Sequence, residues 1–288
     1  MTLAAALEKL DNAIATSCID SHVLCAVTSK VAAEYAYLSF QLSPTEAWRW
    51  GKLSDAAVAA RYCRRLATTH RTSELLATAL EFMAFSADIG RLILRNQQIH
   101  YGLEVDQLTH GSVSAEYLRR IAKTIAEDHF GEMLLTAVSV HSHRENPTLQ
   151  TVSDCPCTLA LCQLLRDLDR LGNWLSGDEY LQRWKMDAEM AVWGFTEAPY
   201  IPEHTTAAFL RSEPVDRASA ETYAGYMLQF LSWGYQFSYK ELWREAVATG
   251  NPGFVLEYVR DQLLAGGHSC MWQQIEKHAE QTLGITTA

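Results

Sequence analysis

Apolar residues recur at three- and four-residue intervals along most of the chain, which is the spacing that places them on one face of an α-helix. Leu3, Leu7, Leu10 and Ile14 follow this rule near the start. Strand-like alternation of apolar and polar residues is scarce, and no convincing repeat or low-complexity tract interrupts the pattern. The sequence therefore predicts an all-α fold.

Capping and turn residues divide this pattern into separate elements. Ser43 followed by Pro44 suits a helix start, because serine caps the first N–H groups and proline fits the first turn. Residues 94–112 and the proline-containing stretch 144–157 are predicted to be loops. Helical patterns cover residues 2–39, 42–48, 54–70, 72–87, 114–130, 132–143, 158–175, 220–237, 252–265 and 269–283.

The composition indicates a sizeable core and an acidic chain. Of the 288 residues 48% are apolar, and the formal net charge is −10. The acidic balance argues against a general nucleic-acid binder, which usually carries a basic excess. We expect one helical domain spanning residues 1–288, with SEPVDRAS (212–219) as the best candidate for an internal joint.

The N-terminal sequence gives no targeting signal. MTLAAALEKLDNA lacks the basic flank and apolar core of a signal peptide. No uncharged apolar run approaches the ~18 residues that a membrane span needs. Seven cysteines at irregular spacings do not indicate a disulfide framework. We expect a cytoplasmic protein with no membrane partner.

One carboxylate follows a segment that the pattern predicts to be buried. Residues 72–87 are apolar nearly all round, which marks a buried helix, and Asp88 comes directly after them. Ionised carboxylates are seldom fully buried unless they are paired or bound to a metal ion. Asp88 is therefore predicted to have a partner.

Four segments place a metal-capable side chain at the end of an apolar helix or beside it. Imidazole and carboxylate ligands together suit Mn²⁺, Fe²⁺, Zn²⁺ or Mg²⁺. Each group alone has a plainer reading, as a hydrogen-bonded structural histidine or as the charged stripe of a helix. The candidates are Asp88, His110, His141 with His143, and Asp167 with Asp169. Of HSH (141–143) we select His141, because it lies four residues after Ala137 on the apolar stripe.

Four motifs in order, two of them in one stretch, resemble the HD-domain metal-dependent phosphohydrolase superfamily. SADIGRLILRNQQIHYGLEVDQLTHGSVSAEYL (86–118) is similar to its buried helix ending in His-Asp-Ile-Gly-Arg or Lys, followed after a loop by a histidine and a small residue. AVSVHSHRENP (137–147) resembles its later histidine helix. LCQLLRDLDRLGNWL (161–175) resembles the helix that supplies its last metal aspartate. FLSWGYQFSYKELW (230–243) is a weaker echo.

The resemblance implies a fold and a set of site residues. The fold would be an HD-domain-like helical bundle with its core at about 55–175, extra helices in 1–50 and a helical section in 176–288. Asp88 and Asp167 would be metal ligands. His110 and His141 would be the extra imidazoles of binuclear members, and with Asp88 they are the candidate catalytic residues. Contacts to substrate phosphate would come from Arg91, Arg144, Arg166 and Arg170, since guanidinium groups recognise phosphate oxygens.

The sequence departs from the family at two histidines. Ala87 stands where the namesake histidine precedes Asp88. The first histidine of the family is expected 25–30 residues before Asp88, and none lies in 56–67, while His70 is too close and His22 too far. Two carboxylates without both imidazoles favour weak Mg²⁺ or Mn²⁺ binding over tight transition-metal binding.

Three functional hypotheses stay open. The first is a divergent HD-type protein that binds a phosphorylated small molecule, such as a nucleotide, and hydrolyses a phosphate ester with a divalent metal. The second is a catalytically inactive protein, with or without metal, that binds a ligand or a partner on the same fold. The third is an HD-fold di-iron oxygenase, which ranks lowest because the missing imidazoles weaken an iron site most.

A Cys-Pro-Cys motif is a separate candidate for a soft metal. DCPC (154–157) has Cys162 nearby. The motif lacks a second cysteine pair or a well-spaced histidine, so the sequence alone does not complete a site.

Overall fold

The computed structural model describes residues 1–42, 53–101, 110–143, 148, 152, 155–175 and 195–287. These residues form helices and no strand, apart from one isolated bridge between Thr196 and Thr222, so the prediction of an all-α fold is confirmed. The α-helices are α1 (Leu3–Ile14), α2 (Ser21–Phe40), α4 (Leu53–His70), α5 (Glu74–Ser86), α6 (Ile89–Tyr101), α7 (His110–Ile121), α8 (Lys123–Ala126), α9 (His129–Val140), α10 (Pro156–Leu175), α12 (Glu203–Leu210), α13 (Tyr223–Ser232), α14 (Lys240–Ala248), α15 (Asn251–Ala265) and α16 (Ser269–Leu283). Short 3₁₀ helices lie before and after α13, at Arg217–Ser219 and at Trp233–Gln236.

The chain divides into two compact units. Residues Met1–Gly172 form the first and Asn173–Ala288 the second, so the division falls inside α10. The joint expected at 212–219 lies within the second unit instead. That the two units act as one domain stays a prediction.

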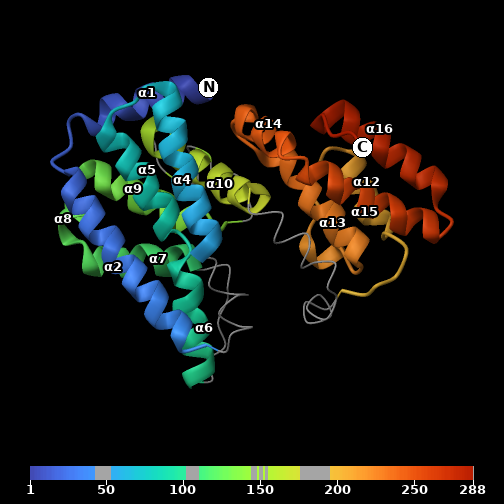
Figure 1. The fold of residues 1–288 in the computed structure, drawn as a ribbon, viewed down its shortest axis with the longest axis horizontal. Coiled ribbons are helices and arrows are strands. Elements are labelled where there is room, and N and C mark those ends of the chain that lie inside the picture. The colour runs from blue at the N-terminus through green and yellow to red at the C-terminus, as the bar shows by residue number, and fades with distance from the viewer. Residues whose placement is uncertain are drawn as a thin grey trace. The chain divides into compact units, whose positions relative to one another are not determined.

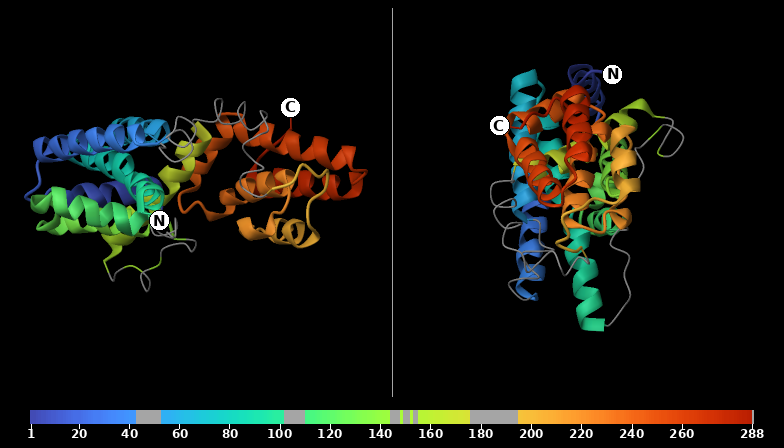
Figure 2. Two further views of the ribbon diagram at one scale, coloured as in Figure 1. Left: turned by 90° about the horizontal axis from the view of Figure 1, so that it is seen from below. Right: turned by 90° about the vertical axis from the view of Figure 1, so that its right-hand side faces the viewer.

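Helix α5 is the centre of the first unit. It contacts α1, α2, α4 and α9, which surround it in the ribbon view (Figure 1) and in the views from other sides (Figure 2). Leu76, Leu80, Phe82 and Met83 are all fully buried, as the nearly continuous apolar run of this helix predicts. The Ser73 hydroxyl caps the helix by accepting a hydrogen bond from Leu76 N at 3.2 Å.

The start of α9 is tied to the connection between α1 and α2. The Asp128 carboxylate caps α9 by accepting from the backbone N–H groups of Phe130 and Gly131. The same carboxylate accepts from the Ser17 hydroxyl and from the backbone N–H of Cys18, both at 2.8 Å. One side chain thus joins segments more than a hundred residues apart.

Several of the predicted boundaries are wrong. Helix α6 was not predicted, and it occupies the first part of the loop expected at 94–112. Its polar Asn96 is buried, where its side-chain amide donates to Leu38 O at 3.2 Å and to Leu92 O at 2.9 Å. The helix predicted at 114–130 is divided at Ala122, whose backbone leaves the helical conformation. The helix predicted at 42–48 lies almost wholly outside the described residues.

The second unit packs around aromatic side chains. The Trp174 ring lies against those of Phe230 and Trp243, with ring centroids 4.6 and 6.1 Å apart. Polar atoms fix this core from within: the Asn251 amide donates to Trp174 O at 2.7 Å, and Trp243 Nε1 donates to Leu283 O at 2.9 Å. Helices α12 and α14, which belong to this unit, were not predicted from the sequence pattern.

Among the helices of the described chain, none is long and apolar enough to cross a membrane.

Two phenylalanines of the first unit provide a test of this core. Phe82 is fully buried in α5, whereas Phe40 at the end of α2 is 87% exposed. We expect Phe82→Ala to lower the free energy of unfolding by about 3–5 kcal/mol, because it removes buried apolar surface and leaves a cavity. Phe40→Ala should change it by less than about 0.5 kcal/mol. Denaturant unfolding of both variants measures this, and equal losses would contradict the described core.

Candidate metal centre

Asp88 lies in the tight turn between α5 and α6. The Ser114 hydroxyl from α7 holds this turn, donating to Ala87 O at 2.6 Å and accepting from Gly90 N at 2.8 Å. Gly90 is required for the close approach, since a Cβ there would lie 2.1 Å from the backbone oxygen of His110. The end of α5 and the start of α7 are thereby brought together.

A second glycine brings the start of α7 against the end of α9. A Cβ at Gly111 would lie 2.7 Å from the backbone oxygens of both Val138 and Ser139. His110 is the first residue of α7, and His141 follows the last residue of α9. The two approaches, at Gly90 and Gly111, therefore place His110 and His141 beside Asp88.

The three side chains converge on one point. His110 Nε2 lies 3.0 Å from Asp88 Oδ1 and 3.1 Å from His141 Nε2, and His141 Nε2 lies 3.6 Å from Asp88 Oδ1. All three residues are at most 5% exposed. Three of the four metal-ligand candidates named from the sequence thus meet in one buried cluster, and they come from three helix ends.

Hydrogen bonds orient the two imidazoles. His141 Nδ1 lies 2.7 Å from Val138 O. A carbonyl oxygen only accepts, so Nδ1 carries a proton, and Nε2 of His141 faces the cluster. Burial, and secondly the charge of Arg91, lower the pKa of His110 to about 4, so the His110 ring is neutral at neutral pH.

Two further side chains border the cluster. The Arg91 guanidinium donates to Asp88 Oδ1 at 2.6 Å, which offsets the cost of burying the carboxylate. Tyr35 of α2 is fully buried, and its hydroxyl makes no hydrogen bond of ordinary geometry. Burial raises the pKa of Tyr35 well above its usual value, and the nearby Asp88 charge raises it further. In the sequence, Tyr35 stands on an apolar stripe, and nothing there indicates that it lies near Asp88.

The triangle of ligand atoms has the size that a divalent ion requires. Zinc-like ions bind imidazole nitrogen and carboxylate oxygen at about 2.0–2.2 Å, so ligand atoms around one ion are about 3–3.5 Å apart. The three separations here are 3.0, 3.1 and 3.6 Å. A metal ligand must offer a lone pair, which the neutral His110 ring can do. The residues fit one ion.

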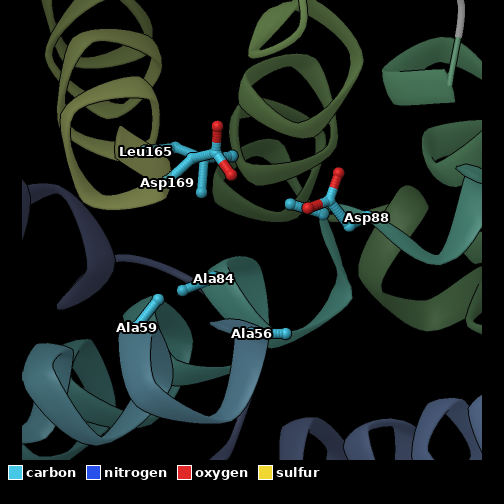
Figure 3. A pocket seen from close by; sticks show the side chains of 7 residues that line it. Ala56, Ala59, Ala84, Asp88, Leu165 and Asp169 are labelled. Atoms are coloured by element: carbon cyan, nitrogen blue, oxygen red, sulfur yellow. The ribbon is translucent and has the colours of Figure 1, made fainter. Parts of the chain in front are cut away.

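The fourth candidate, Asp167, is not part of this cluster. It is fully buried on α10, while Asp169, two residues further, lines a pocket together with Asp88. Figure 3 shows the Asp88 and Asp169 side chains on one side of this pocket and Ala56, Ala59 and Ala84 on the other. The pattern RDLDR contained both aspartates, but the sequence gave no means of choosing between them.

Alanine side chains line the pocket where the resemblance implies imidazoles. Ala87 occupies the position of the namesake histidine, and Ala56 and Ala59 lie in the segment where the first histidine was expected. The pocket measures about 10 Å³, which is room for about one water molecule. The described residues that line this pocket thus include no nitrogen ligand, whereas His110 and His141 both lie beside Asp88.

The arginines named as phosphate contacts lie in different surroundings. Arg91 is paired with Asp88. Arg166 and Arg170 are buried on α10, and burial lowers their pKa values to about 10 and about 9, while the charges of Asp167 and Asp169 act in the opposite direction. Arg144 lies outside the described residues.

The lowered pKa of His110 predicts acid sensitivity of the metal-free protein. Unfolding restores a pKa near 6.5, so between about pH 6.5 and 4 the unfolded chain binds a proton that the folded chain does not. The free energy of unfolding should therefore fall by up to about 3 kcal/mol as the pH falls through this range, and be unaffected by this group above it. We expect His110→Gln to show a correspondingly shallower fall. Denaturant unfolding with chelator from pH 7.5 to 4 measures both; equal slopes would contradict the assignment.

Comparisons with known proteins add no relative to this picture. Searches with protein-family models, among curated proteins and among solved structures find no significant match to the chain. The resemblance to the HD-domain superfamily rests on the motifs quoted above.

Proposed function

We propose that the first unit is a divergent HD-type helical domain that binds one divalent transition-metal ion through Asp88, His110 and His141. The observation that carries this proposal is the set of three ligand atoms separated by 3.0–3.6 Å inside the protein. His110 begins α7, His141 directly follows α9, and Asp88 lies in the turn between α5 and α6, so the cluster depends on the fold and not on sequence proximity.

The ligand set favours borderline ions over Mg²⁺. Two imidazoles and one carboxylate suit Zn²⁺, Fe²⁺ or Mn²⁺, whereas Mg²⁺ prefers oxygen ligands. The loss of histidines on the alanine side argued for weak Mg²⁺ or Mn²⁺ binding. The approach of His110 to His141 supports tighter binding on the opposite side of Asp88.

The activity that we propose is hydrolysis of a phosphate ester in a small molecule. A bound ion would polarise a phosphoryl oxygen and lower the pKa of a coordinated water. Arg91 places a guanidinium beside the centre, where it would meet phosphate oxygens.

A catalytically inactive protein is the second candidate. The specific observation in its favour is the size of the pocket, about 10 Å³, which admits a water molecule but no phosphate ester. Asp88 already accepts hydrogen bonds from Arg91 and His110, so the cluster is also a satisfied buried network without an ion. In this case the centre would stabilise the unit and bind no substrate.

Two histidines of the same short motif test the metal site. His141 is buried in the cluster, while His143 is exposed. We expect purified protein to bind about one equivalent of Zn²⁺, Mn²⁺ or Fe²⁺, and His141→Ala to remove stoichiometric binding, because three ligands are needed for a firm site. His143→Ala should bind as the parent does. Equilibrium dialysis with metal analysis decides this; equal losses in the two variants would reject the centre.

An activity screen separates the two candidates. Protein loaded with each metal is assayed against a panel of phosphomonoesters and nucleotides for release of phosphate. Turnover that is lost in Asp88→Asn, with the fold retained by circular dichroism, is the expected result. Stoichiometric metal without turnover on any substrate would reject hydrolysis and select the inactive candidate.

A further inference from the structure

Three sulfur atoms lie together at the start of α10, away from the residues of the metal centre. Cys155 Sγ is 3.8 Å from Met133 Sδ of α9. Cys155 and Cys157 are close enough for each side chain to shift the pKa of the other. The sequence suggested a soft-metal site at Cys-Pro-Cys with Cys162 nearby but did not complete it, and the fold places the thioether of Met133 beside Cys155.

Local structure places both cysteines at the start of α10. Pro156 is the first residue of α10, and the backbone oxygen of Cys155 accepts from Leu159 N at 3.1 Å, so Cys155 stands at the cap position of the helix. Cys157 lies in the first turn. Both cysteines are partly exposed, whereas Met133 is only 6% exposed. An ion could therefore enter from solvent and meet a third ligand that packing already holds.

The environment favours a thiolate at Cys155. The backbone N–H of Thr158 is the main cause that lowers the pKa of Cys155, as expected at a helix N-terminus. Burial raises the pKa of Cys157, and the charge of Cys155 raises it further, while Lys9 acts in the opposite direction. The Cys155 charge is the second cause that raises the pKa of Cys157. A cation bound between the two sulfurs would offset this repulsion.

The kinds of ligand select a soft ion. Thiolate and thioether sulfur together favour Cu(I), whereas structural Zn²⁺ takes four ligands from cysteine, histidine and carboxylate. Among the described residues, the Asp88–His110–His141 group is the one set of three or more such side chains close enough to share an ion, so none completes a zinc site here. Three sulfurs around one ion at about 2.3 Å stand about 4 Å apart. The observed 3.8 Å between Cys155 and Met133 agrees with this spacing.

We propose that Cys155, Cys157 and Met133 form a three-sulfur binding site for one Cu(I) ion. The two cysteines bind as thiolates and Met133 binds through its thioether. This site shares no residue with Asp88, His110 or His141, so it does not depend on the function proposed for that centre.

Cu(I) titration of the full-length protein tests the proposal. The exposed cysteines elsewhere are first removed as Cys18→Ser, Cys25→Ser and Cys270→Ser, while Cys63 and Cys162 are buried and kept. Under anaerobic reducing conditions, with a chromophoric Cu(I) chelator as competitor, this background should bind one equivalent. Adding Cys157→Ser should abolish competition with the chelator. Met133→Leu replaces the thioether by an apolar side chain of similar volume, so the fold should be retained. We expect the affinity for Cu(I) to fall about tenfold or more, because one sulfur ligand is lost.

X-ray absorption at the copper edge gives an independent readout. Three sulfur scatterers and no nitrogen are expected. Nitrogen scatterers would place the ion on the imidazoles and overturn the proposal. Unchanged affinity in Met133→Leu would also overturn the three-sulfur site, as would binding that survives Cys157→Ser in a protein shown to be folded by circular dichroism.

Discussion

The burial of the Asp88 carboxylate is the constraint on which the arrangement of the first unit depends. An ionised carboxylate at this depth is unstable unless donors or a cation reach it, and the surrounding helices end where they deliver those groups. Arg91 comes from the next turn of the chain, and His110 and His141 come from helix ends that two glycines allow to approach closely. The same close approach therefore determines both the packing of the helices and the positions of the ligand side chains. A side chain at Gly90 would displace both.

The sequence predicted the parts of the fold that depend on local periodicity, and it failed where tertiary contacts decide. Long amphipathic and apolar runs marked α4, α5, α10, α15 and α16 within a few residues. Helix α6 was missed. Its Asn96 appears polar in the pattern, although the side-chain amide donates to a backbone oxygen of α2 and the residue is buried. On a helix, Asp167 and Asp169 point in different directions. Only the packing of α10 determines that Asp169 reaches the pocket beside Asp88.

The candidate site was predictable as a set of residue types and not as a geometry. An apolar helix ending in Asp88 and histidines near later helix ends were visible, and these residues do meet. The resemblance implied His110 and His141 as ligands, and it also marked two positions without a histidine, where alanines line the pocket beside Asp88. A single carboxylate has two faces, so the side chains at one face do not determine those at the other. Spacing along the chain does not reveal which side chains meet at each face.

The Asp128 carboxylate has a consequence for the order in which the first unit forms. Its bonds to Ser17 and Cys18 close a loop of more than a hundred residues, and such closure carries a large entropy cost until the intervening helices are in place. The connection between α1 and α2 is therefore expected to become ordered late in folding, after α9 has formed. In the native state, exchange of the Cys18 amide with solvent would then report on the separation of the first helix from the rest of the bundle.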